Sequence, residues 1–384
     1  MLDWLGVASR VEALEDVVLD EDLVRACEAR NVVTPADSSA NRVNFYTPTF
    51  KYFESSELSS CGKSAWPAVS ITGGDCKLQC DHCKAKILEP MIPARSPDEL
   101  WRVVNKVVSE GGQGMLLTGG SNHQNEVQYG PYYSTIRRIK DEFPEFKIAM
   151  HTALVNDDVA LSMEQAGIDA AMMDVIGSQE TITQVYHLKR SVDDFEATLA
   201  SLVKTKMKVV PHIVIGLHYG KLLGEWNSLE ILKRHLPAAV VLVVVMPQYA
   251  PAKRPFVTPD PVAAGRFFLD ARAALPTIPL LLGCARPSGI VKMQLDTYAV
   301  MAGVSGIAHP SEGMVELAAR LGRRVAVTPS CCSIAIGDEV LALEDSRSLE
   351  LDLEQIISHE RVNRKRPAGA GVKLAGIPVI TRVA

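Results

Sequence analysis

From residue 68 to about residue 310, short apolar runs rich in β-branched residues alternate with amphipathic segments that have helical spacing. This alternation is typical of βαβ units around a parallel sheet, and it constrains the fold more than any other feature of the chain. We expect eight strands, at residues 68–72, 115–118, 147–151, 170–175, 208–215, 240–245, 280–282 and 307–309. Eight βα units over about 250 residues predict an α/β fold, either a (β/α)₈ barrel of the TIM type or a partial barrel with fewer closed strands.

The segments on either side of these units are expected to be extensions. Residues 1–60 start with a helical pattern and become polar and irregular, which predicts an N-terminal helical extension. We expect the barrel over residues 61–310 and a C-terminal extension over residues 311–384.

The composition is that of an ordinary globular protein and argues against two classes of partner. The chain has 384 residues, 47% hydrophobic and 22% charged, and a formal net charge of -5. We expect no nucleic-acid partner, because long runs of like charge are lacking and the basic stretch at residues 361–366 is short. We expect no membrane span, because the longest apolar run, residues 238–246, is too short to cross a bilayer. The acidic N-terminus does not have the pattern of a signal peptide, so we expect a cytoplasmic protein.

Three closely spaced cysteines follow the first expected strand. Cys76, Cys80 and Cys83 form the pattern C-x3-C-x2-C, in a loop where a TIM-type barrel carries its active site. Soft thiolates select an iron–sulfur cluster or zinc over hard cations. A structural zinc site takes four ligands, so zinc would require His82 or a distant cysteine as the fourth. We expect a cluster on the three cysteines, with one iron open to a small-molecule ligand.

This loop resembles the defining motif of the radical S-adenosylmethionine (SAM) superfamily, in which it follows the first strand of an α/β barrel. The resemblance implies that the three cysteines bind a [4Fe–4S] cluster and that its open iron binds SAM. It also implies that reductive cleavage of SAM yields a 5′-deoxyadenosyl radical. The family usually has an aromatic residue just before the third cysteine, where this chain has His82.

Glycine and polar residues follow the later strands, at the end where a barrel opens its site. Gly119 and Gly120 match a glycine-rich turn that contacts the amino group of SAM in the resembling family, although Ser121 replaces its acid. A Gly-Gly pair after a strand is also consistent with a simple turn, and a lone histidine with a structural role. The candidate cofactor-binding residues are Gly119, Gly120, His151, Thr152 and Gly216, and the candidate catalytic residues are Asp174 and His218.

Four further cysteines are candidate ligands of a second iron–sulfur cluster: Cys61, Cys284, Cys331 and Cys332. They come from distant parts of the chain and lack the spacing of a zinc knuckle. Ser333 is an additional candidate ligand. The alternative is that they are scattered core thiols, which is the expected role of Cys27.

A longer set of motifs resembles the biotin-synthase-like branch of the superfamily, and within it the second subunit of the two-protein lipoyl synthase. The set comprises AVSITGGDCKLQCDHC, LLTGG, DVIGSQETITQVY, VVPHIVIGLHYGK, LGCARP and the late CC pair. The resemblance implies insertion of sulfur at C6 and C8 of an octanoyl chain on a lipoyl carrier protein, with a second cluster as the sulfur source. It implies a sister radical SAM subunit and an electron donor such as ferredoxin or flavodoxin as partners.

Two alternatives stay open. One is another radical SAM enzyme, such as a biotin-type synthase, a methylase or an isomerase. The other is a non-catalytic metal-binding scaffold that assembles a partner enzyme.

Overall fold

The computed structural model describes residues 3–31, 41–48, 55, 57–58, 66–252, 255–328, 330–334 and 336, all within one compact unit, Met1–Leu349. The predicted ligand Cys61 and most of the predicted C-terminal extension lie outside the described residues. No helix in the described part of the chain is long and apolar enough to cross a membrane.

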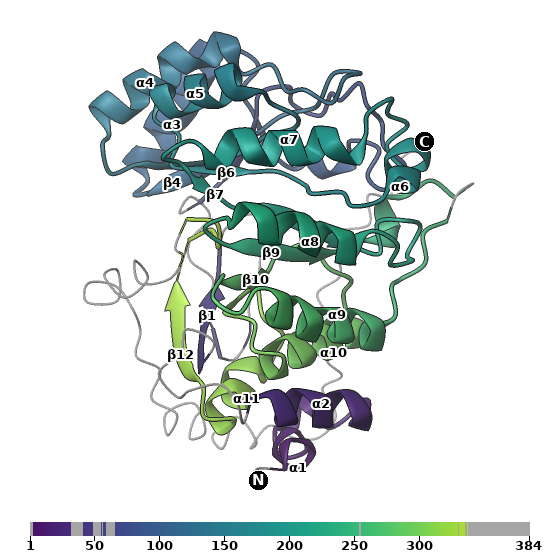
Figure 1. The fold of residues 1–384 in the computed structure, drawn as a ribbon. Coiled ribbons are helices and arrows are strands. Elements are labelled where there is room, and N and C mark those ends of the chain that lie inside the picture. Colours follow the sequence, from purple (N-terminus) through teal and green to yellow (C-terminus); the bar gives the residue numbers. More distant parts are fainter. Residues whose placement is uncertain are drawn as a thin grey trace, which may run out of the picture. The chain divides into compact units, whose positions relative to one another are not determined.

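The described strands form two six-stranded sheets in which all neighbours are parallel (Figure 1). The first sheet has the order β3-β2-β4-β5-β6-β7, with bounds Ile92–Pro93, Ala68–Ser70, Gly114–Thr118, Lys147–His151, Ala170–Met172 and Lys208–Val209. The second has the order β12-β1-β11-β10-β9-β8, with bounds Arg324–Thr328, Arg42–Tyr46, Gly306–Ala308, Leu280–Leu282, Val240–Val244 and His212–Ile215. Strands occur at all eight predicted positions.

Pro211 separates β7 from β8 and joins the two sheets. Proline has no N–H to donate, but the Pro211 carbonyl accepts from the Val241 N–H at 2.9 Å, and the His212 N–H donates to the Met173 carbonyl at 2.7 Å. Residues 208–215 therefore run as one bent strand from the first sheet into the second. Among the described strands none pairs with the outer edge of β3 or β12, so the expected α/β fold is present as a partial barrel.

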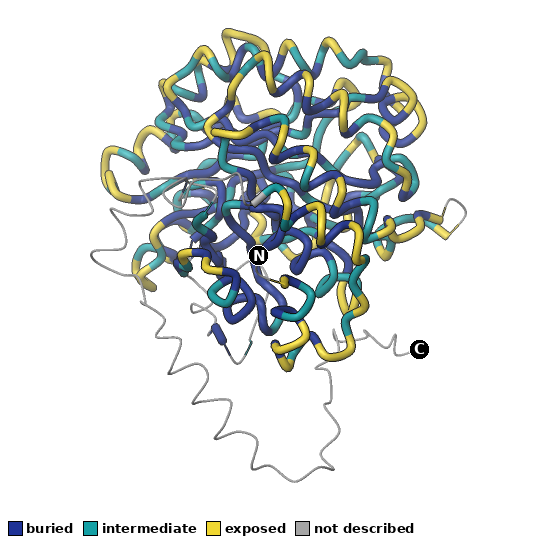
Figure 2. Tube along the Cα trace, turned by 60° about the horizontal axis from the view of Figure 1, so that its bottom comes forward, coloured by how far each residue is buried: buried dark blue, intermediate teal, exposed yellow. Residues whose placement is uncertain are grey.

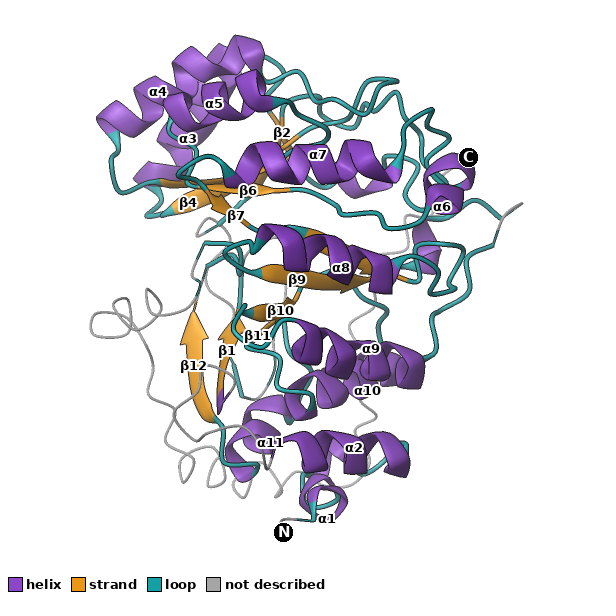
Figure 3. Cartoon of the chain, viewed as in Figure 1, coloured by secondary structure: helices purple, strands orange, loops and turns teal. Residues whose placement is uncertain are grey.

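Helices cover the outer face of the strands. Their bounds are α1 Trp4–Ala8, α2 Glu21–Asn31, α3 Pro97–Ser109, α4 Tyr133–Glu142, α5 Asp157–Ala166, α6 Gln179–Gln184, α7 Val192–Val203, α8 Glu225–His235, α9 Pro261–Ala274, α10 Ile290–Met301 and α11 Met314–Arg320. The helices α7, α8, α9 and α10 contact one another in that order along the strands (Figure 3). Most strand residues are buried, and the interior of the molecule is dark blue in Figure 2. This burial explains why most strands appear in the sequence as continuous apolar runs.

Polar side chains mark where several helices begin. The Ser96 hydroxyl accepts from the Glu99 N–H at the start of α3, and the Asn156 side chain accepts from the Val159 N–H at the start of α5. Ser191 and Asp194 form a reciprocal capping box at α7. These side chains satisfy N–H groups that have no partner within the helix.

The strand β1 was not predicted, because its segment was expected to be irregular. β1 pairs with β11 and β12, and its Asn44 is buried. The Thr328 hydroxyl donates to the Asn44 side-chain oxygen at 3.0 Å, so this polar residue is accommodated inside the sheet. Strands from both predicted extensions thus complete the second sheet, and the boundaries at residues 60 and 310 stay predictions.

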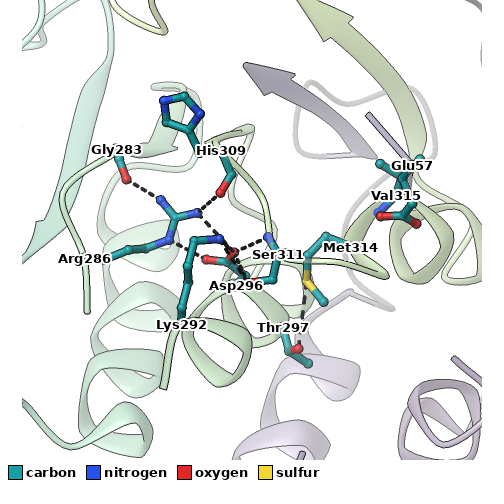
Figure 4. A network of polar contacts seen from close by, with 10 residues as sticks. All are labelled: Glu57, Gly283, Arg286, Lys292, Asp296, Thr297, His309, Ser311, Met314 and Val315. Atoms are coloured by element: carbon teal, nitrogen blue, oxygen red, sulfur yellow. Dashed lines mark hydrogen bonds and ion pairs between the residues drawn. The ribbon is translucent and has the colours of Figure 1, made fainter. Parts of the chain in front are cut away.

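A buried ion pair fixes the ends of β10 and β11 (Figure 4). The guanidinium of Arg286 contacts both carboxylate oxygens of Asp296 on α10, at 2.6 and 3.1 Å, and neither side chain is exposed. Arg286 also donates to the carbonyls of Gly283 and His309, the residues that follow the two strands. Lys292 provides a second cation for Asp296 at 2.9 Å. The network holds the loop after β10, which carries Cys284.

We predict that Asp296→Asn lowers the free energy of unfolding by about 3 kcal/mol, because it leaves the buried Arg286 charge uncompensated. Chemical denaturation followed by circular dichroism measures this change. Asp157→Asn is the matched control, because the Asp157–Lys204 pair is exposed and solvent screens it. Equal stability of the two variants would contradict the prediction.

Candidate active site

The three motif cysteines line one cavity at the carboxyl ends of β2, β4, β5 and β6. The cavity has a volume of about 150 Å³. Besides Cys76, Cys80 and Cys83, its lining includes Thr118, Gly119, Gly120, His151, Thr152, Met173, Asp174 and Tyr186. The structure therefore brings together most of the predicted site residues.

The cysteine loop, residues 71–91, follows β2 and is folded by tight turns. Gly73, Gln79, Lys84 and Ala85 all have positive φ, which allows the chain to reverse direction within a few residues. The Lys77 N–H donates to the Ser121 carbonyl at 2.8 Å, which ties the loop to the segment after β4. The loop therefore turns around the three sulfur atoms.

The cysteine loop sets different pKa values on its thiols. Burial and the nearby Cys83 and Cys76 raise the pKa of Cys80 well above its ordinary value. Burial also acts to raise the pKa of Cys83, but the His82 imidazole outweighs it and lowers the pKa. Metal ligation requires thiolates. The lowered pKa of Cys83 favours its thiolate form, whereas Cys80 must lose its proton when the metal binds.

At Gly120, the turn after β4 lies very close to the backbone of the cysteine loop. A Cβ atom at residue 120 would lie 1.9 Å from the Asp75 carbonyl oxygen and 2.6 Å from the Cys76 Cα. The Gly120 N–H donates to the Thr72 hydroxyl at 2.7 Å. Only glycine allows this approach, so the turn after β4 has a steric role beyond that of a simple turn.

Several polar side chains surround Asp174, which lines the same cavity as the three cysteines. The Asp174 carboxylate lies 3.7 Å from His151 Nε2, and the Tyr186 hydroxyl donates to it at 3.3 Å. The His212 ring centroid lies 5.4 Å from that of His151. Burial acts to raise the pKa of Asp174, but the imidazoles of His151, His212 and His82 lower it to about 2. Asp174 is therefore a carboxylate surrounded by donors.

The sequence did not single out Tyr186 or His212 as site residues. His212 starts β8 beside Asp174, and burial together with the His151 charge lowers its pKa to about 4. A histidine at the beginning of an expected strand carries no local signal of a site. Its neighbours are His151, which ends β5, and Asp174, which follows β6, so only the pairing of strands brings His212 next to them. His212 does not itself line the cavity.

Gly216 and His218 do not line the cavity. Gly216 has a φ of 76° and its N–H donates to the buried Glu225 carboxylate at 2.8 Å. His218 Nδ1 lies 3.2 Å from the Thr181 hydroxyl on α6 and lines a separate small hollow. The chain turns sharply after β8, which carries His218 toward α6 and away from the cysteines.

Three of the remaining cysteines come together elsewhere in the barrel. Cys332 belongs to a core cluster of buried residues, and Cys284 and Cys331 pack against the same cluster. The Cys331 sulfur lies 2.9 Å from the Ser333 hydroxyl. Hydrogen bonding with Cys332 lowers the pKa of Cys331 to about 7, although burial opposes the shift. Cys27 is buried in α2, as expected for a core thiol.

The first cavity lies in a part of the chain that matches a known protein family. Residues 70–221 match the model of the radical SAM superfamily, a range that begins in β2 and contains the cysteine loop and Asp174. The chain carries a radical SAM domain. Its cofactors are therefore a [4Fe–4S] cluster and SAM.

Two solved structures have a similar fold over most of the chain. HydG, a maturase of the [FeFe]-hydrogenase, is 13% identical with a TM-score of 0.55, over 90% of this chain and 80% of HydG. Methylornithine synthase (PylB) is 14% identical with a TM-score of 0.50, over 96% of this chain and 93% of PylB. At such low identity these likenesses show the fold alone. A comparison with curated proteins gave no match.

The residues of the radical SAM domain fit a cluster better than a single metal ion. The ligands of one zinc ion lie about 3.8 Å apart, because each is about 2.3 Å from the metal. The described residues contain no group of three or more Cys, His, Asp or Glu side chains that could hold one ion. Three thiols spaced around a cavity suit a cluster with several irons.

We predict that Gly120→Ala reduces the iron bound by the reconstituted protein, because the new methyl group would displace Cys76. Gly130→Ala is the matched control, since a Cβ at residue 130 meets no atom within 4 Å. Iron analysis and absorbance of the cluster measure the difference. Equal iron in both variants would show that the loop accommodates the methyl group.

We also predict that Asp174→Asn lowers the pKa of His151. Burial acts to lower this pKa, and the charge of Asp174 turns the net shift upward. The raised pKa of His151 and the lowered pKa of Asp174 both stabilise the folded state. The contribution is full between about pH 4 and 6.5 and is lost when the pH falls through the pKa of Asp174 or rises through that of His151.

Titration of the histidine ring signals by NMR measures this shift. Asp158→Asn, at an exposed aspartate of α5, serves as the control and should leave His151 unchanged. A His151 titration curve unaffected by Asp174→Asn would mean that the pair does not interact.

Proposed function

We propose that this protein is a radical SAM enzyme that inserts sulfur into an octanoyl chain on a lipoyl carrier. The observation that carries the proposal is the convergence of Cys284, Cys331 and Cys332, three thiols outside the cysteine loop, on one part of the barrel core. A radical SAM domain needs only the three motif cysteines for its cluster. The additional thiols support a second cluster that serves as the sulfur source.

The first site supplies the radical chemistry. When bound, its cluster and SAM supply a 5′-deoxyadenosyl radical that removes hydrogen from an unactivated C–H bond. Cys76, Cys80 and Cys83 would hold the cluster, and Gly119 and Gly120, which line the same cavity, would offer backbone groups to SAM. His151, Thr152 and Asp174 present polar groups to the remaining part of SAM or to the substrate.

The second site supplies the sulfur. Cys284, Cys331 and Cys332 would hold the additional cluster, with Ser333 beside Cys331 as a further oxygen ligand. The mutual hydrogen bond of Cys331 and Cys332 lowers the pKa of Cys331 and raises that of Cys332, so Cys331 is the thiol of this pair that more readily takes the ligating thiolate form.

Apolar side chains lie next to both sites. The core cluster that includes Cys332 also includes Met172, the neighbour of the cavity residue Met173, together with Ala149 and Val241. An octanoyl chain is a hydrocarbon, so burial against such residues is favourable and excludes water from a carbon radical. A sister radical SAM subunit, an octanoylated carrier and a ferredoxin or flavodoxin as electron donor are the proposed partners, in the cytoplasm.

We predict that the reconstituted protein binds about eight irons, corresponding to two [4Fe–4S] clusters, and that Cys284→Ala and Cys331→Ala each reduce this to about four. Cys27→Ala is the control, because Cys27 is a buried thiol in α2 that lies outside the cluster formed by the other three. An unchanged iron content in both variants would remove the sulfur source from the proposal.

We predict that anaerobic incubation with SAM, a reductant and an octanoylated carrier adds sulfur to the acyl chain and releases 5′-deoxyadenosine. Mass spectrometry of the carrier and chromatography of the nucleoside measure the two products. 5′-Deoxyadenosine without sulfur on the carrier, even with the sister subunit present, would favour another radical SAM enzyme. Absence of both products from fully loaded protein would favour a scaffold.

A further inference from the structure

Asp81 lies between Cys80 and His82 and is buried, with 5% of its side chain exposed. The Tyr219 hydroxyl donates to its carboxylate at 3.0 Å, and Lys84 Nζ donates to it at 2.9 Å. His187 Nε2 lies 3.0 Å from the same carboxylate. The Asp81 N–H also donates to the Val185 carbonyl at 2.9 Å. The side chain therefore ties the cysteine loop to two other segments, one after α6 and one after β8.

The two distant partners have unusual backbone conformations. His187 has a φ of 58° and Tyr219 a φ of 55°, which are left-handed values that non-glycine residues rarely adopt. Such conformations persist only where surrounding contacts require them. Both residues line an outer hollow with Thr183, Gln184 and Pro255, separate from the cysteine cavity. His187 and Tyr219 thus contact Asp81 from outside the cysteine cavity.

Asp81 and Lys84 also place opposite charges within the cysteine loop. Lys84 Nζ donates to the Gln79 carbonyl at 2.7 Å, so its position is fixed at both contacts. Reduction of a cluster adds one negative charge, so a fixed charge beside it changes its reduction potential. A negative charge lowers the potential, and a positive charge raises it.

We propose that Asp81 is a positioning residue for the [4Fe–4S] cluster, which holds the Cys80–Cys83 turn in place and, together with Lys84, sets the reduction potential of the cluster. This role rests on the cluster of the radical SAM domain and does not depend on which substrate the enzyme uses.

The charge part of the proposal is tested with four variants and a redox titration of the reduced cluster followed by EPR, in reconstituted protein without SAM. Asp81→Asn removes a negative charge and should raise the midpoint potential. Lys84→Met removes a positive charge and should lower it. The double variant should return the potential toward that of the parent protein. Asp75→Asn is the matched control, because Asp75 adjoins Cys76 but has 80% of its side chain exposed.

Opposite shifts for the two single variants support the proposal, since a purely structural defect gives no such sign reversal. Shifts of the same sign, or an Asp81→Asn potential equal to that of Asp75→Asn, would overturn it. If Asp81→Asn retains no iron, the charge part of the proposal is tested with Lys84→Met alone. A midpoint potential of Lys84→Met equal to or higher than that of the parent protein would overturn it.

The positioning part is tested with Tyr219→Phe, which removes the hydroxyl that contacts both Asp81 and the Gln184 carbonyl and leaves every charge in place. Its cluster should release iron to a chelator on the order of three- to ten-fold faster, with an unchanged midpoint potential. Tyr133→Phe, at a tyrosine of α4, serves as the control. Equal rates of iron release from the parent and Tyr219→Phe would show that Asp81 does not hold the turn.

Discussion

Parallel pairing of strands is the constraint on which the rest of this structure depends. Because every strand runs in the same direction, the loops that follow them gather at one edge of the sheet. The cysteine loop after β2, the glycine turn after β4 and the polar residues that end β5 and follow β6 meet there without being close in the chain. The bent strand at Pro211 extends the same arrangement to β8 through β11, and so to Cys284.

The strands and the first cluster were predictable because their signals are local. A strand covered on both faces must be apolar throughout, as in VVLVV of β9, and such runs are visible without knowledge of their neighbours. The three motif cysteines lie within eight residues of one another, so any fold of the loop keeps them together.

The features that the sequence did not reveal depend on distant partners. β1 contains the buried Asn44, whose side-chain oxygen accepts a hydrogen bond from Thr328, far away in the chain. In the sequence, Asp81 looks like an ordinary loop aspartate, and only the structure shows its contacts with His187 and Tyr219. His218 follows an expected strand, but the turn after Gly216 carries it to Thr181 on another element. In each case the decisive contact joins residues that no local pattern connects.

The position of β1 has a consequence for how the chain is made. β1 pairs with β11 and β12, and its Asn44 lies opposite Gly306 and Ala326. During synthesis, β4, β5 and β6 each follow a strand with which they pair. In contrast, β1 is made long before its partners β11 and β12. Its apolar residues Val43 and Phe45 therefore have no strand partner until β11 and β12 have been made. Among the described strands, β1 precedes all others in the chain and pairs only with strands that follow much later.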